Sequence, residues 1–130
     1  MKILILIAML FFHIIDDYYL QGILASMKQK SWWEKNAPDE LYDHDYIMAL
    51  YEHAFSWTVM IHIPCIFYQI FLNDSSVSSF HYLFTFIVMI VIHALVDNAK
   101  ANKKTINLIQ DQLCHILQVF YLWFYYCFMY

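Results

Sequence analysis

Histidine and aspartate residues recur four positions apart in this sequence, inside stretches that are otherwise apolar. The three pairs are His13 and Asp17, His93 and Asp97, and Asp111 and His115. Residues four apart lie on one face of an α-helix, one turn above the other. Each helix would thus present an imidazole and a carboxylate together, a donor set that suits zinc, manganese and non-haem iron. The spacing therefore predicts several helical faces that could share a metal ion.

Further polar residues lie in the same stretches. We expect His53 to join the metal ligands, with Glu52 beside it as a general base or proton shuttle; a water-facing carboxylate is the alternative for Glu52. Asp16 is about 100° round the helix from Asp17, so it is either a second ligand or a hydrogen-bonding partner between helices. Lys100, at the end of the third stretch, is either an anion contact for a substrate or an orientation signal beside the membrane.

The stretches that hold these residues are apolar enough to cross a bilayer. The 130 residues are 62% hydrophobic and only 14% charged, and a transmembrane helix needs about 20 largely apolar residues. Four segments have that length: 3–24, 46–72, 80–99 and 106–128. The sequence therefore predicts an all-α, polytopic integral membrane protein. Residues 1–130 would form a single membrane domain, a bundle of four transmembrane helices.

Lysine residues are distributed unevenly over the predicted loops. Six of the seven lie in or beside the first and third loops, one lies near the N-terminus, and the second loop, NDSSVSS, has none. Cytoplasmic loops are enriched in lysine and arginine, so we expect these two loops in the cytoplasm and both termini outside. Antiparallel helices would then bring the polar residues to one leaflet. The net charge of −4 and the absence of a broad basic face argue against nucleic acid as a partner.

The polar motifs follow one another in a definite order. They are HIIDDYYLQ (His-x-x-x-Asp-aromatic-x-x-Gln), the histidine of YEHAF, HALVDNAK (His-x-x-x-Asp-x-x-Lys) and DQLCH (Asp-Gln-x-x-His). This ordered set resembles a family of small bacterial and phage integral membrane proteins with four helices and no assigned activity. The resemblance implies a prokaryotic cytoplasmic (inner) membrane and allows a phage-encoded origin. Histidines and aspartates on hydrophobic helices are also similar, more loosely, to membrane-bound metal-dependent hydrolases.

Seven of the polar residues are the predicted metal ligands. They are His13, Asp17, His53, His93, Asp97, Asp111 and His115. Because seven exceeds the four ligands of one tetrahedral zinc, the set allows one or two ions, or outer partners that orient the ligands. Zinc is the expected metal, with manganese and non-haem iron as alternatives; the aspartates fit a haem less well. The competing interpretation is a metal-free His–Asp hydrogen-bond network, which would be expensive in lipid.

The leading functional hypothesis is a metal-dependent hydrolase that acts on an amphiphilic or lipid-linked substrate near the cytoplasmic leaflet. A divalent metal activates water and polarises a carbonyl or phosphoryl oxygen. Glu52 and Lys100 would be the catalytic residues, as proton shuttle and anion contact. The alternatives are a proton or divalent-cation transporter lined by the same groups, and a phage lysis or host-interaction membrane protein. Polar residues become sparse toward the outer leaflet, where His62 is expected to be structural, and this favours a site over a pore.

Overall fold

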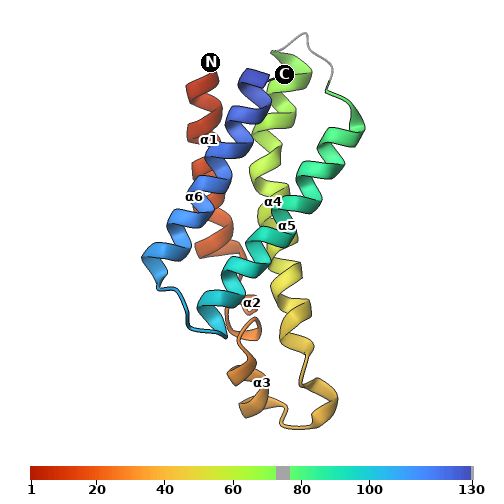
Figure 1. Ribbon diagram of the computed structural model, residues 1–130, viewed down its shortest axis with the longest axis vertical. Helices are drawn as coiled ribbons and strands as arrows, with labels where there is room; N and C mark the ends of the chain where they lie inside the picture. The colour runs from red at the N-terminus through yellow and green to blue at the C-terminus, as the bar shows by residue number, and fades with distance from the viewer. Residues whose placement is uncertain (73–76, 130) are drawn as a thin grey trace.

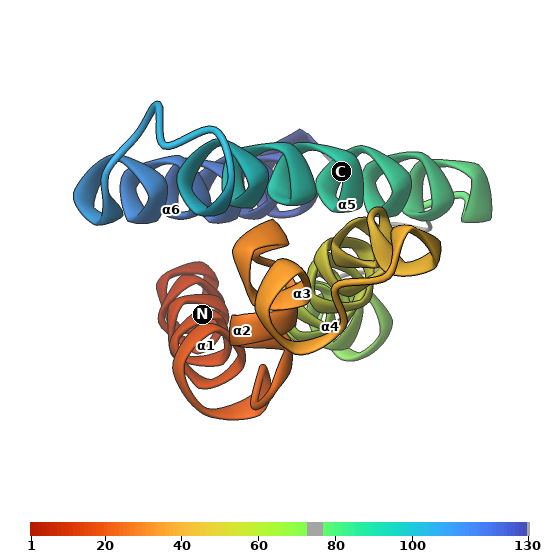
Figure 2. The same cartoon turned by 90° about the horizontal axis from the view of Figure 1, so that it is seen from below.

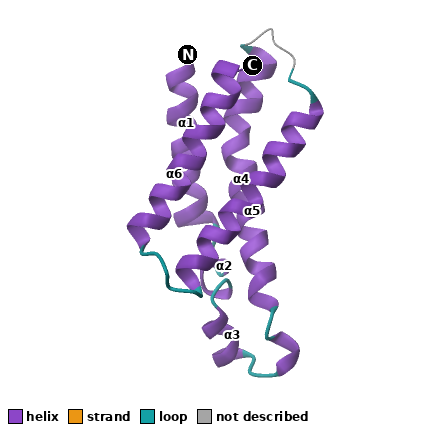
Figure 3. Cartoon of the chain, in the orientation of Figure 1, coloured by secondary structure: helices purple, strands orange, loops and turns teal. Residues whose placement is uncertain are grey.

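The long helices of the protein run side by side along its length. In the computed structural model, residues 1–72 and 77–129 are described, and every regular element in these ranges is helical (Figures 1 and 3). The four longest helices are α1 (Lys2–Ile15), α4 (Asp45–Phe71), α5 (Ser79–Ala101) and α6 (Leu108–Phe124). The prediction of an all-α chain is confirmed. The predicted second loop falls mostly on residues 73–76, outside the described residues.

Two of the long helices continue into a π-helical turn. α1 is followed by Asp16–Leu20 and α6 by Tyr125–Met129. The helical backbone of the first segment ends at Gln21, so the predicted helix 3–24 is too long. The cause is Gly22, the single glycine of the chain, which has a φ of +49°. That conformation is open to glycine without strain and turns the chain away from the helix axis. The other three predicted helices agree with the structure to within two residues at each end, if the π-helical turn is counted with α6.

The long helices form two layers, as Figure 2 shows. α5 and α6 make one layer, and α1 and α4 make the other. Each helix packs against two others, because α4 contacts α1 and α5 while α6 contacts α5 and α1. Both termini lie at one end of the bundle, and the short helices α2 (Leu24–Met27) and α3 (Lys30–Asn36) lie toward the other (Figure 1).

The side chain of Asn102 ties the segment that contains α2 and α3 to the end of α5. The Asn102 amide oxygen accepts from the Lys30 backbone N–H at 2.7 Å, and its nitrogen donates to the Lys28 carbonyl at 3.0 Å. The indole of Trp33 donates to the Met27 carbonyl at 2.6 Å and ties α3 back to α2. These bonds place Lys28 beside the bundle, although it belongs to the predicted first loop.

The outside of the bundle is largely apolar. Among the described residues, three helical segments are long and apolar enough to cross a membrane: Lys2–Leu20, Glu40–Phe71 and Ser79–Ala101. α6 is not one of them, because Gln110, Asp111, Gln112 and His115 in its first two turns lower its hydropathy. The structure therefore shows three candidate membrane-spanning helices, and the fourth crossing remains a prediction.

The buried residues divide the bundle into two parts. The part near the termini, here called the apolar half, has a core of buried hydrophobic side chains: Ile5, Met9, Ile61, Cys65, Met89, Val119, Leu122 and Tyr126. In the part toward α2, here called the polar half, the buried side chains are mainly histidine, aspartate and lysine. α4 and α5 run through both halves and contribute to each. The predicted site residues all belong to the polar half or its surface.

Candidate functional site

All seven predicted metal ligands lie in one buried cluster in the polar half. None of them exposes more than 5% of its surface. α1 and its π-helical turn supply His13 and Asp17, α4 supplies His53, α5 supplies His93 and Asp97, and α6 supplies Asp111 and His115. The i,i+4 pairs do share a face, with nitrogen-to-oxygen distances of 4.0, 3.9 and 3.5 Å for the three pairs in chain order. Four helices thus converge on one polar site.

Asp97 contacts cluster residues from several different elements. Its Oδ1 lies 3.2 Å from His115 Nε2, and its Oδ2 lies 3.5 Å from His53 Nε2. The same Oδ2 accepts a hydrogen bond from Lys28 Nζ at 2.6 Å. One carboxylate on α5 therefore joins α4, α6 and the residue that follows α2.

The two other predicted aspartate ligands are linked to each other through Gln112. Asp17 Oδ2 accepts from Gln112 Nε2 at 2.8 Å, while its Oδ1 lies 3.2 Å from His53 Nε2. Asp111 Oδ2 accepts from Gln112 at 3.2 Å and from Lys100 Nζ at 2.5 Å. Each carboxylate thus has one oxygen fixed by a donor and the other directed at an imidazole, because Asp111 Oδ1 lies 3.5 Å from His115 Nε2.

His93 occupies the centre of a group of aromatic rings. Its imidazole stacks on His115 and on Trp57, with centroids 4.0 and 4.2 Å apart, and meets His53 edge-on at 5.0 Å. Among the described residues, neither ring nitrogen of His93 has a hydrogen-bond partner, although the residue is fully buried. A buried polar atom without a partner is costly. The lone pair of this ring is therefore free to bind a cation.

Neighbouring side chains fix which nitrogen of His115 and of His13 carries a proton. His115 Nδ1 lies 3.1 Å from the Gln118 side-chain oxygen, so Nδ1 donates and Nε2, directed at the aspartates, can serve as a ligand. The Trp57 indole N–H donates to His13 Nδ1 at 2.8 Å. The neutral His13 ring must then carry its proton on Nε2. In this arrangement Trp57 occupies His13 Nδ1, and His13 belongs to neither of the two triads described below, so its role as a metal ligand stays a prediction.

Two triads have the geometry of a metal site within the described ranges. They are Asp17 with His53 and His93, and His93 with Asp97 and His115, each with its ligand atoms within 4.8 Å of one another. Atoms bound to a tetrahedral zinc at about 2.0–2.2 Å lie about 3.3–3.6 Å apart. The His–Asp distances of 3.2, 3.5 and 3.9 Å in the cluster are close to that spacing. His93 belongs to both triads. Buried histidine and aspartate groups of this cluster could therefore hold a metal ion.

Two further charged side chains join the cluster: Lys28, which the sequence motifs do not single out, and Asp16, for which a hydrogen bond between helices is one of the two alternatives predicted from the sequence. Lys28, which the lysine distribution counts as a loop residue, is only 6% exposed and pairs with Asp97. Asp16 is fully buried, accepts from Ser56 Oγ at 2.5 Å and lies 3.5 Å from His53 Nδ1. The π-helical turn explains Asp16, since its carbonyl accepts from the N–H five residues later and the wider turn directs both aspartates inward.

The charges of the cluster do not cancel. With neutral imidazoles, the four carboxylates of Asp16, Asp17, Asp97 and Asp111 and the two ammonium groups of Lys28 and Lys100 leave a net charge of −2. Unbalanced buried charge is strongly unfavourable, more so in a membrane. One divalent cation or two protons on the histidines would balance it. The composition of the cluster is compatible with both.

Of the two residues predicted to be catalytic, only Lys100 lies near the cluster. Its ammonium pairs with Asp111. Glu52 is exposed on α4 and lines a surface pocket with Tyr51 and Phe55, because neighbouring helical residues point about 100° apart and His53 faces inward. This exposed position agrees with the alternative of a water-facing carboxylate, and a catalytic role for Glu52 stays a prediction.

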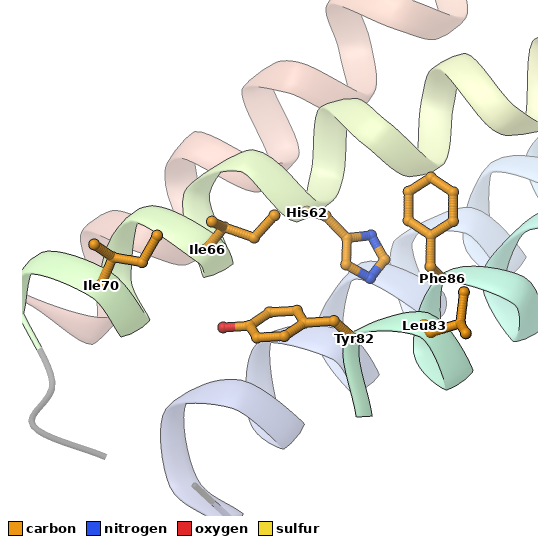
Figure 4. A pocket seen from close by; sticks show the side chains of 6 residues that line it. All are labelled: His62, Ile66, Ile70, Tyr82, Leu83 and Phe86. Carbon is orange, nitrogen blue, oxygen red and sulfur yellow. The ribbon is translucent and has the colours of Figure 1, made fainter. Parts of the chain in front are cut away.

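His62 lies away from the cluster, in the apolar half. It borders a cavity of about 380 Å³ between α4 and α5, together with Ile66, Tyr82 and Phe86 (Figure 4). Its Nδ1 donates to the Thr58 carbonyl at 2.8 Å and its Nε2 lies 3.4 Å from Thr85 Oγ1. Both nitrogens thus have partners on the helices, as expected for a structural histidine.

Comparison of the chain with family models, curated proteins and solved structures finds no match. The class of protein is therefore defined by the geometry of this chain alone. It is an all-helical protein with three candidate membrane-spanning helices and a buried cluster of histidine and aspartate that could hold a metal ion.

Proposed function

We propose that the protein is a membrane-embedded, metal-dependent hydrolase with one divalent ion, zinc, bound by His93, Asp97 and His115. The observation that carries the proposal is the fully buried His93 ring, whose two nitrogens have no hydrogen-bond partner within the described residues. His93 belongs to both of the triads that could hold a metal ion, and each of them contains a carboxylate. A cation bound there would give its ring nitrogen a partner. One divalent ion would also bring the net charge of the cluster from −2 to zero.

The chemistry follows from the groups around the proposed ligands. A bound divalent ion would activate a water molecule and polarise a carbonyl or phosphoryl oxygen of the substrate. His53 is placed to take up the proton, because its two nitrogens lie 3.5 Å from Asp16 and 3.2 Å from Asp17. This pair of carboxylates orients the ring and would stabilise its protonated form. His53 thus takes the role that the sequence assigns to Glu52.

We further propose that all four long helices cross the membrane and that the polar half lies in the cytoplasmic leaflet. α6 exposes Leu113, Leu117 and Phe124 on its outer face, as a lipid-facing helix does, even though its inner face is polar. Six of the seven lysines belong to the α2–α3 segment and to the end of α5, both at the end of the bundle away from the termini. The order of the motifs, similar to that of small bacterial and phage membrane proteins, supports a prokaryotic inner membrane.

Proton or cation transport through the same cluster is the second candidate. One observation favours it: Lys28 and Lys100 already bind the Oδ2 atoms of Asp97 and Asp111, so part of the compensating charge comes from the chain itself. Against it, the cluster is closed on the side of the apolar half by Trp57 and by a core of aliphatic side chains. A conducting path needs polar groups on both sides.

The proposed activity can be tested on protein purified in detergent, stripped with a chelator and reloaded with zinc, manganese or ferrous iron. The probes are a long-chain p-nitrophenyl carboxylic ester and an alkyl p-nitrophenyl phosphodiester, with release of nitrophenolate as the readout. We expect release to require metal and to fall by at least about 100-fold in Asp97→Asn, beyond the loss typical of outer partners of a metal. Glu52→Gln, the exposed carboxylate one residue from His53, is the control and should keep the wild-type rate.

Two outcomes would contradict the proposal. If the protein binds metal but cleaves neither probe with any of the three ions, the hydrolase assignment is wrong and the metal site stands. If Asp97→Asn cleaves as fast as wild type, the cluster is not the site of the reaction.

A further inference from the structure

Three adjoining spaces surround the face of the cluster between α1 and α6. The largest, of about 640 Å³, is a groove whose walls are Leu10, Ile14, Tyr18, Tyr19 and Ile116, and these five residues define the tail groove. Its remaining lining residues, His13 and Gln112, belong to the cluster or contact it. The tail groove is therefore an apolar channel along the outside of the bundle that ends on the polar site.

The second space is polar and lies directly beside the cluster. It has a volume of about 140 Å³, is lined by Asp17, Gln21, Lys28 and Lys100, and shares Tyr18 and Gln112 with the tail groove. The third space, of about 410 Å³, shares Gln21, Lys28 and Lys100 with the second and adds Lys104 at the end of the bundle. A ligand could thus extend from the tail groove past Asp17 to three lysines.

We propose that these spaces form one binding site for an anionic amphiphile, with its acyl chain in the tail groove and its phosphate head beside Lys28, Lys100 and Lys104. The proposal names the substrate class of the proposed hydrolase and in that respect rests on it. In this arrangement the bond next to the head lies beside Asp17, the carboxylate that contacts His53. The occupant is a lipid, since the groove is apolar along its length and opens on the outer surface of α1.

The charge at one end of the site and the apolar lining at the other both favour an anionic amphiphile. The three lysines border the same space, and an ammonium group has three donors, of which Lys28 and Lys100 are each seen to use one on an aspartate. Lysine is a common binder of phosphate as a point charge. At the other end Ile14 and Tyr19 are exposed and face the surroundings of α1, so an acyl chain could enter sideways from a bilayer. A neutral lipid would offer no charged acceptor to the remaining donors of these lysines.

The test uses the whole protein in dodecyl maltoside after chelator treatment, so that binding is measured without metal and without turnover. Dodecyl phosphate is the probe, and native mass spectrometry gives the fraction of protein that carries it. We expect dodecyl phosphate to bind at least about tenfold more tightly than dodecanol, dodecyl trimethylammonium or inorganic phosphate. Affinity should also rise along the series of butyl, octyl and dodecyl phosphate, because each added CH₂ buries apolar surface.

Lys104→Glu is the main variant, and Lys103→Glu is its matched control. Both residues are exposed and adjacent in sequence, but only Lys104 lines the space that holds the head. We expect Lys104→Glu to weaken dodecyl phosphate binding about tenfold and Lys103→Glu to leave it within about twofold. In the groove, Ile14→Trp should weaken binding of the dodecyl chain, whereas Leu95→Trp, an exposed position on α5 outside the groove, should not.

Several results would overturn this site. Inorganic phosphate that binds as tightly as dodecyl phosphate would show a site for free phosphate, and equal binding of dodecanol would show a groove without an anion site. Equal effects of Lys103→Glu and Lys104→Glu on dodecyl phosphate binding would show that the anion is attracted by general surface charge and not by a specific site. Failure of the proposed hydrolase activity can be told apart from failure of this site. If dodecyl phosphate binds with these variant effects but no ester is cleaved, the binding site stands and the hydrolase assignment is wrong. If neutral esters are cleaved and phosphate-bearing amphiphiles are not preferred, the hydrolase proposal stands and the proposed anionic binding site is rejected.

Discussion

The two halves of the bundle are buried to the same degree but are held together by different interactions. In the apolar half, aliphatic side chains such as Ile61 and Val119 are fully buried and pack directly against one another. In the polar half, Asp97 and His93 are just as inaccessible, yet with neutral imidazoles the charged groups around them leave a net charge of −2. Apolar packing is complete without a ligand, whereas an unbalanced cluster needs a cation or protons. The difference indicates that packing alone accounts for the apolar half, whereas the polar half could hold a metal ion.

Trp57 lies at the boundary and contacts both halves. It packs in the apolar core, stacks on His93 and donates to His13. Removal of this side chain should affect both halves and should give the largest loss of stability. Trp57→Ala should lower the free energy of unfolding by about 4 kcal/mol, as expected for a large fully buried aromatic. Reversible unfolding in detergent, followed by circular dichroism, measures this effect.

Trp57→Phe is the matched control for that change, because it keeps an aromatic ring at this position while it removes the indole N–H and part of the indole volume. We expect it to cost about 1–3 kcal/mol, the penalty for leaving His13 Nδ1 without its donor. If the two variants were equally destabilised, the hydrogen bond to His13 would account for the whole effect and the packing role of Trp57 would be rejected.

Lys28→Met should produce the second largest effect and should depend on metal. The variant leaves Asp97 buried without its ammonium partner at 2.6 Å, and breaking a buried pair costs about 3–5 kcal/mol. Added zinc should restore part of this loss, since a divalent ion can replace the missing charge. Thermal melts of chelator-treated and zinc-loaded protein provide the measurement.

The control for this charge is Lys30→Met. Lys30 is exposed and its ion pair with Glu34 is long, at 3.9 Å, so its removal should change stability by about 0–1 kcal/mol with or without zinc. A Lys28 variant no less stable than the Lys30 variant would show that the polar half tolerates its charge without compensation.

The i,i+4 spacing and the lysine distribution differ in how much of the site they predict. The i,i+4 pairs predict that His93 and Asp97 share a helical face, because helical periodicity is local and independent of the rest of the fold. Burial of Lys28 depends instead on Asn102, 74 positions along the chain, whose side chain holds the Lys28 carbonyl. No local pattern encodes such a contact between two connecting segments.

Asp16 and Glu52 show a second limit, that of ideal helix geometry. An ideal helix separates neighbouring residues by about 100°, which predicts that Asp16 and Asp17 face different ways. The π-helical turn from Asp16 directs both inward, and its position cannot be read from the apolar pattern. Glu52 and His53 keep the ideal separation, so only the histidine reaches the site.

Ile61→Val should give the smallest of these changes in stability. It tests the apolar half, where no dependence on metal is expected. Removing one methylene from a fully buried position costs about 1 kcal/mol. Because Ile61 belongs to the apolar half, we expect the loss to be the same in chelator-treated and in zinc-loaded protein. A loss that changed with zinc would show that the two halves are coupled through α4, and the division between them would have to be abandoned.

The central claim is that the polar half binds one divalent ion, and elemental analysis tests it most directly. Protein is stripped with a chelator, dialysed against equal concentrations of zinc, manganese and ferrous iron, and its metal content measured by mass spectrometry alongside a thermal melt. We predict one ion per chain, mainly zinc, and a stabilisation of about 2.7 kcal/mol at a hundredfold excess over the dissociation constant. His93→Ala, which removes the residue common to both triads, should lose the ion and the stabilisation together. A metal content near zero in the wild type, with melting unchanged by chelator, would contradict the claim and leave a protonated His–Asp network in its place.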